Sequence, residues 1–113
     1  MASPIPSQWK QKVRSILSSG DRKRIIIRQR ALLNWSDLFP DLYPGDLLIA
    51  LSDALEESDL LGNQIADMDE SGEVYEFIFT YSSRAIYSKI NLCPDGTMVI
   101  IYSAHRPLKG EAL

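Results

Sequence analysis

The chain has 113 residues, of which 45% are hydrophobic and 24% charged, so it is long enough for one hydrophobic core and too short for two domains. No apolar run reaches the length of a membrane span, the first residues lack the apolar stretch of a secretory signal, and the single Cys93 cannot form an internal disulfide. These features predict one soluble domain over 1–113 in the reducing cytosol, with short flexible ends at about 1–6 and 107–113.

The net charge of −3 hides a strong segregation of charge along the sequence. Residues 1–30 carry a net charge of +7, residues 31–76 carry −12 without a single base, and residues 77–113 carry +2. If the first and last segments lie together, they form a basic face of the kind that binds nucleic acid. Alternatively, the acidic middle segment neutralises the basic one through salt bridges.

Helices are predicted in the first half of the chain. In residues 7–19, apolar side chains recur at helical spacing. Ser7 is suited to cap the first turn of this helix, and Gly20 to end it in the left-handed conformation. The other elements predicted in this half are a short strand over 24–28, a short helix over 30–39 and a second long helix that begins at Pro44.

From Glu73 onward the hydrophobic period changes to two, which is typical of strands. The Pro-Asp-Gly sequence favours a three-residue turn that places Cys93 opposite Thr97. The same register places Tyr87 opposite Ser103. The helices then have to cover one face of the sheet, which predicts an α+β domain of N-terminal helices on a small antiparallel sheet. Its strands are predicted over 73–81, 84–92 and 97–105, joined by Ser82-Ser83 and by CPDG.

This register divides the sheet into two faces. The apolar face gathers Phe77, Phe79, Ile86, Ile90, Leu92, Met98 and Ile100. The opposite face, here called the mixed face, gathers Glu76, Tyr87, Lys89, Asn91, Ser103 and His105. An ordinary solvated face explains such a mixture. A phenol, a cation and an imidazole are also the groups that metal-free RNA cleavage needs, because that reaction moves protons and stabilises charge on a phosphorane.

Several segments, in their order and approximate spacing, resemble the MqsR toxin family within the wider RelE-like ribonuclease superfamily of toxin–antitoxin systems. They are "KVRSILSSG", "RQRALLN" followed by "WSDL", "LLIALSDALEESDL", "YSKI" and "MVIIYSAH". The resemblance implies a RelE-like two-layer domain, an mRNA-cleaving activity without a metal or other cofactor, and a cognate antitoxin protein as partner.

Three residues correspond to positions of the family motif. Tyr87 falls on the sheet tyrosine of the family, Lys89 on the lysine two residues after it, and His105 within one residue of the basic group that ends the last strand. The family also carries a lysine shortly after its second long helix, for which "SDLLGNQ" offers no equivalent. Gln64 is the nearest polar residue to the catalytic glutamine of the family, and the sequence pI of about 5.0 departs from the basic character of such toxins.

The leading hypothesis is therefore a metal-independent endoribonuclease toxin acting on single-stranded mRNA. In this hypothesis His105 is the acid or base, and Tyr87 and Lys89 stabilise or orient the reacting groups. The alternative is a noncatalytic interaction module of the same fold, whose acidic middle segment binds a partner protein. A small regulatory nucleic-acid binder is a third reading, without a helix-turn-helix or RNA-recognition pattern to support it. The basic residues predicted to bind RNA are Arg22, Lys23, Arg24, Arg84 and Arg106.

Overall fold

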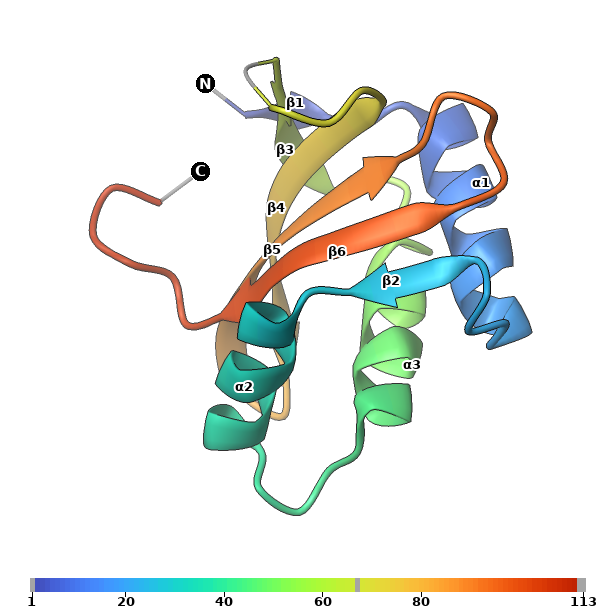
Figure 1. Ribbon diagram of the computed structural model, residues 1–113. Coiled ribbons are helices and arrows are strands. Elements are labelled where there is room, and N and C mark those ends of the chain that lie inside the picture. Colours follow the sequence, from blue (N-terminus) through green and yellow to red (C-terminus); the bar gives the residue numbers. More distant parts are fainter. Residues whose placement is uncertain (1, 67, 112–113) are drawn as a thin grey trace.

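The computed structural model describes residues 2–66 and 68–111 and shows an α+β domain. Three helices and one six-stranded sheet make up this part of the chain (Figure 1). The helices are α1 (Ser7–Ser19), α2 (Gln29–Leu38) and α3 (Pro44–Ala54). The strands are β1 (Ser3–Pro4), β2 (Ile25–Ile27), β3 (Leu61–Ile65), β4 (Glu73–Tyr81), β5 (Arg84–Leu92) and β6 (Val99–His105).

The strand order is β1-β3-β4-β5-β6-β2, so the antiparallel meander β3 to β6 forms the centre of the sheet. Short strands from the N-terminal part of the chain complete both edges. Strand β1 pairs antiparallel with β3, and β2 pairs parallel with β6 (Figure 1). The parallel pair brings the basic N-terminal segment beside the last strand of the sheet. Ser3, Pro4 and the buried Ile5, which we expected in a flexible end, instead belong to the sheet and the core.

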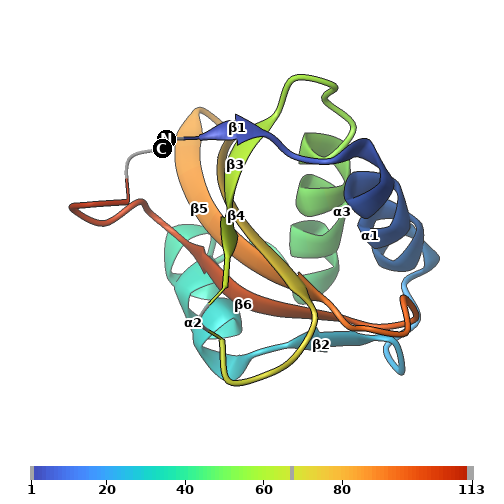
Figure 2. The same cartoon turned by 90° about the horizontal axis from the view of Figure 1, so that it is seen from above.

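The helices cover one face of the curved sheet and share a single hydrophobic core. Helices α1 and α3 lie side by side, while α2 packs against β6 (Figure 2). Trp9 and Val13 of α1 point into the core, together with Trp35 of α2 and Leu51 of α3. Among the residues that the structure describes, no helix combines the length and apolar character needed to cross a membrane.

The ends of α1 confirm one sequence prediction and correct another. Gly20 follows the helix with a φ of 65°, the left-handed conformation expected of a terminal glycine. Ser7 is the first helical residue rather than the cap, because Pro6 occupies the N-cap position and no side-chain hydrogen bond caps the helix. Proline at N1 of α3, Pro44, is as predicted.

The β4–β5 hairpin has the predicted register. Ser82 and Ser83 form the two-residue turn, both with positive φ, and they place Glu76 opposite Lys89. Positive φ at both turn positions matches the right-handed twist of the flanking strands. Local turn chemistry therefore sets this part of the mixed face.

The predicted register of the β5–β6 hairpin is wrong. The Cys93 backbone N–H donates to the Met98 carbonyl instead of facing Thr97, and the register shifts again between Lys89 and Ile90, where Tyr102 is the extra residue of a β-bulge.

As a result, Tyr87 faces His105 and Lys89 faces Ser103. The two shifts together move the partner by two residues, so the mixed face keeps these side chains. The shift near the turn exchanges which side chains of the last strand face the helices. The core cluster contains Val99, Ile101 and Ala104 in place of the predicted Met98 and Ile100.

Candidate functional site

The mixed face holds a groove of about 290 Å³ that collects residues from distant parts of the chain. Its floor is formed by side chains of β5 and β6, and its walls come from the start of α2, from the segment before β4 and from the segment after β6. The lining residues are Arg30, Met68, Tyr87, Lys89, Tyr102, Ser103, His105, Leu108 and Glu111. The three residues predicted to be catalytic, Tyr87, Lys89 and His105, therefore share one groove.

The imidazole of His105 is held in place on two sides. Its ring stacks on the ring of Tyr87 at a centroid distance of 5.1 Å and an angle of 25°. Its Nδ1 lies 2.7 Å from the carbonyl oxygen of Arg106. Because a carbonyl only accepts hydrogen bonds, Nδ1 carries a proton here. The neutral ring then leaves Nε2 as the nitrogen that can accept a proton, which is the arrangement required of a general base.

A carboxylate also approaches this imidazole. Glu111 Oε1 lies 3.8 Å from His105 Nδ1, and the same oxygen accepts a hydrogen bond of 2.7 Å from the Leu108 backbone N–H. The segment after β6 therefore turns back towards the groove. Residues 108–111, which the sequence assigns to a flexible tail, contribute one wall of the candidate site.

Tyr87 is fixed more tightly than the sequence suggested. Its hydroxyl donates a hydrogen bond of 2.6 Å to Glu76 Oε1, and Asn63 Nδ2 lies 3.2 Å from the other oxygen of that carboxylate. Burial first, and the neighbouring Glu76 second, raise the pKa of Tyr87 far above its ordinary value. Tyr87 thus stays a phenol at neutral pH and serves as the platform under His105 rather than as a proton acceptor.

Lys89 supplies the positive charge of the groove floor. It stands between Glu76 on β4 and Ser103 on β6 in the cross-strand register. Within the described residues its ammonium group forms no ion pair within 4.0 Å. Arg30 adds a second cation at the groove wall. Two positive charges beside a histidine are the electrostatic setting that an anionic substrate such as a phosphodiester requires.

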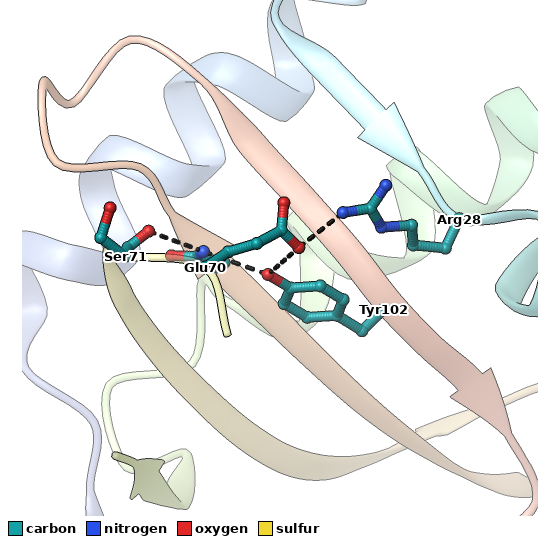
Figure 3. Close-up of polar contacts among 5 residues, drawn as sticks. Arg28, Glu70, Ser71 and Tyr102 are labelled. Atoms are coloured by element: carbon teal, nitrogen blue, oxygen red, sulfur yellow. Dashed lines mark hydrogen bonds and ion pairs between the residues drawn. The ribbon is translucent and has the colours of Figure 1, made fainter. Parts of the chain in front are cut away.

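A second polar network lies on the mixed face beside the groove (Figure 3). Glu70 Oε1 accepts hydrogen bonds from Arg28 Nη2 at 2.5 Å and from the Tyr102 hydroxyl at 2.9 Å. The buried Asn91 side chain donates to the Tyr102 hydroxyl at 3.2 Å and to the Ser71 carbonyl at 3.1 Å. The arginine hydrogen bond, followed by that of Tyr102, lowers the pKa of Glu70.

Sequence reasoning placed Asn91 on the mixed face but missed the roles of Arg28, Arg30, Glu70 and Tyr102. Both arginines belong to the basic segment 1–30, which the sequence analysis singled out. Their position on the mixed face depends on the parallel pairing of β2 with β6, which the sequence analysis did not predict.

The basic residues predicted to bind RNA fall into two groups outside this groove. Arg24 Nε donates to the Thr97 carbonyl, and its own carbonyl accepts from the Val99 N–H, so Arg22, Lys23 and Arg24 lie at the start of β6. His105 ends that strand, about 20 Å away at the rise of an extended chain. These three residues therefore lie beside the turn end of the β5–β6 hairpin, at the opposite end of β6 from the predicted catalytic groups.

Arg84 and Arg106 line a common hollow of about 330 Å³. It lies next to the groove, at the end of β6 that carries His105. Arg84 lies over the Phe39 ring at 5.5 Å and donates to the Leu38 carbonyl at 3.3 Å. Arg106 contributes to the candidate site with its carbonyl oxygen, which holds His105. The hollow is open to solvent, so its guanidinium groups can extend a path for an anionic strand past the groove.

No family model, curated protein or solved structure matches this chain. In the part of the chain that the structure describes, no three His, Cys, Asp or Glu side chains converge as metal ligands.

Proposed function

We propose that the chain is a metal-independent endoribonuclease of the kind found in MqsR-like toxins, with a RelE-like two-layer fold and single-stranded mRNA as substrate. The observation that carries this proposal is the stacking of His105 on Tyr87 with its Nδ1 held by a carbonyl, in a groove that also contains Lys89. This arrangement supports a positioned proton acceptor beside a cation. The N-terminal helices on a mostly antiparallel sheet are compatible with the resemblance.

The reaction follows from these groups. His105 Nε2 takes the proton of a ribose 2′-hydroxyl, the 2′-oxygen forms a bond to the adjacent phosphorus, and the bond from phosphorus to the 5′-oxygen breaks. Lys89 and Arg30 stabilise the negative charge that builds up on the phosphorane oxygens. The leaving 5′-oxygen takes a proton from water in the open groove, and the other product carries a 2′,3′-cyclic phosphate.

The test is His105→Ala, assayed on single-stranded RNA in the presence of EDTA. Loss of a general acid or base costs about 10²–10⁴-fold in rate, so we expect cleavage to fall by that factor and growth arrest on expression to be relieved. The matched control is Leu33→Ala, an exposed residue of α2. Equal cleavage by both variants would refute the role of His105.

A noncatalytic interaction module is the second candidate, and a separate feature favours it. A hollow of about 480 Å³ lies between α1 and α3, with apolar walls that include Leu17, Leu48 and the 61% exposed Ile49. In a noncatalytic module, this apolar surface is the place where a partner protein binds. If the chain is a toxin, the same surface can bind the cognate antitoxin. A wild-type protein that neither cleaves RNA nor arrests growth would favour the module over the ribonuclease.

A further inference from the structure

The carboxylate of Glu70 occupies a point where two donors converge on the mixed face. Arg28 Nη2 and the Tyr102 hydroxyl bind the same oxygen, Oε1, at 2.5 and 2.9 Å (Figure 3). The guanidinium carbon of Arg28 also lies 5.7 Å from the centroid of the Tyr102 ring, in a cation–π contact. A cation and a hydroxyl aimed at one oxygen form a binding site for an anion, whichever anion fills it.

Asn91 sets the direction of the Tyr102 hydroxyl bond. The Asn91 side chain is fully buried, and its Nδ2 lies 3.2 Å from the hydroxyl oxygen. An amide nitrogen only donates, so the Tyr102 oxygen accepts at this contact and its single proton is left for the anion. The hydroxyl is therefore held as a donor towards the position of Glu70 before any ligand arrives.

The anion position adjoins the groove of His105. Tyr102 lines that groove, and His105 follows it by three residues on β6, about 10 Å along the strand. Arg28 follows β2 directly, and its backbone N–H donates to the Ile101 carbonyl. The two donors are thus anchored to paired strands, whereas Glu70 belongs to the connection between β3 and β4.

The carboxylate is also accessible. The side chains of Arg28 and Glu70 are 44% and 42% exposed, so solvent or a ligand can reach both partners of this ion pair. An exposed ion pair contributes little free energy, which makes its replacement by another anion inexpensive. A phosphodiester carries negative charge on non-bridging oxygens that accept hydrogen bonds as a carboxylate does.

We propose that Arg28 and Tyr102 form a subsite for an RNA phosphate that neighbours the one attacked at His105, and that Glu70 occupies this subsite in the free protein. The inference rests on the proposed ribonuclease function. Glu70 then acts as an internal competitor that weakens binding of RNA, and the incoming phosphate takes its place between the two donors.

The test compares two substitutions, each of which removes one negative charge from the protein. Glu70→Gln removes the negative charge that competes for the subsite, while Glu56→Gln is the matched control, since Glu56 forms the exposed ion pair with Arg14 at 2.7 Å. The probe is a single-stranded oligonucleotide with 2′-O-methyl riboses, which lacks the attacking hydroxyl. We expect Glu70→Gln to tighten its binding by roughly two- to fivefold, the factor that an exposed ion pair contributes. Glu56→Gln should change it less than that.

Salt dependence separates competition from a general change of charge. In the wild type, RNA exchanges one ion pair of Arg28 for another, so little counterion is released at this subsite. In Glu70→Gln the contact is new, and the slope of log K against log salt should steepen by about 0.7, the contribution of one phosphate of a single strand. Equal slopes in Glu70→Gln and Glu56→Gln would overturn the proposal.

Double variants test the same subsite independently of the effect of any one substitution on folding. In an Arg28→Gln or Tyr102→Phe background, Glu70→Gln should lose most of its effect on probe binding, and an undiminished effect would overturn the subsite. The His105→Ala background should retain the effect, because the probe reports binding and not cleavage. If Glu70→Gln tightens binding while no variant cleaves RNA, the subsite stands and the ribonuclease proposal fails.

Discussion

The two faces of the sheet are formed by the same strands but are covered by different kinds of structure. Phe77, Ile86 and Ile90 point under the helices, where they are completely buried among apolar side chains. On the mixed face, Asn91 is equally buried, but it is held by hydrogen bonds to the connection before β4 and to Tyr102.

Apolar packing therefore stabilises one face of the sheet, whereas a small number of directed polar contacts orders the other. Substitutions on the helix-covered face should therefore cost stability. Substitutions on the mixed face should chiefly change binding and chemistry, except where a buried polar group loses its partner.

The largest expected effect on stability lies on the helix-covered face. Phe77→Ala removes a completely buried aromatic side chain and should lower the free energy of unfolding by about 3–5 kcal/mol, measured by urea denaturation. Leu33→Ala on α2, where the side chain is 58% exposed, should change it by less than about 0.5 kcal/mol. A similar cost for both variants would contradict the assignment of the core.

Gly72 should be the most sensitive backbone position of the mixed face. Its φ is 132°, and an added Cβ would lie 2.1 Å from Asn91 Oδ1 and 2.7 Å from the Leu92 carbonyl oxygen. Gly72→Ala should cost about 2–3 kcal/mol of unfolding free energy, from backbone strain and from overpacking.

Gly45→Ala is the matched control for Gly72, because nothing lies within 4 Å of its added Cβ. Within a helix this change should stabilise the protein by about 0.4–1 kcal/mol. Thermal unfolding that ranks the two glycines in the opposite order would disprove the close packing of the connection before β4.

A smaller effect is expected at the hydroxyl of Tyr87. Tyr87→Phe removes its hydrogen bond to Glu76 and should cost about 1.5 kcal/mol at neutral pH. Because the pKa of Tyr87 is raised in the folded state, the bond contributes its full stability below about pH 10, the ordinary tyrosine pKa, and loses it as the pH rises further.

The difference in unfolding free energy between wild type and Tyr87→Phe should therefore be constant between neutral pH and about pH 10 and shrink above it. Tyr43→Phe provides a control, since Tyr43 is 76% exposed. A difference that grows with rising pH would show that the sign of the pKa shift is wrong.

The smallest effect concerns the basic residues and depends on the proposed function. Arg30 lines the groove, whereas Arg22 lies near the opposite end of β6. Arg30→Gln should weaken binding of single-stranded RNA at low salt by roughly two- to fivefold, and Arg22→Gln by less than about twofold. Fluorescence anisotropy measures both. A larger loss for Arg22→Gln than for Arg30→Gln would show that RNA does not bind along the groove.

Sequence patterns predicted the elements whose determinants are local. The apolar spacing of α1, its terminal Gly20 and the proline at the start of α3 are confirmed. The period-two segments and the Ser82-Ser83 turn predicted the β4–β5 register correctly, because a two-residue turn leaves the strands no other alignment. The α+β class followed from these elements, since helices before strands have to cover one face of the sheet.

The candidate site was predicted only in part. The alternation of side chains along β5 and β6 placed Tyr87, Lys89 and His105 on one face, and this survives the wrong register because a shift of two residues preserves the face. The partner of each residue was not predictable, because the bulge at Tyr102 is set by how the strand fits its neighbours rather than by the turn.

Local sequence determined the helices, the strands and the set of polar side chains that one face of the sheet presents. Tertiary structure alone decided which distant groups join them: β2 pairs parallel with β6 and brings Arg28 and Arg30 to the mixed face, and Glu70 closes the ion pair across 42 residues of chain. Such contacts depend on loop closure and on the packing of elements far apart in sequence. No local periodicity encodes them, because their energy is gained only when both partners are already folded.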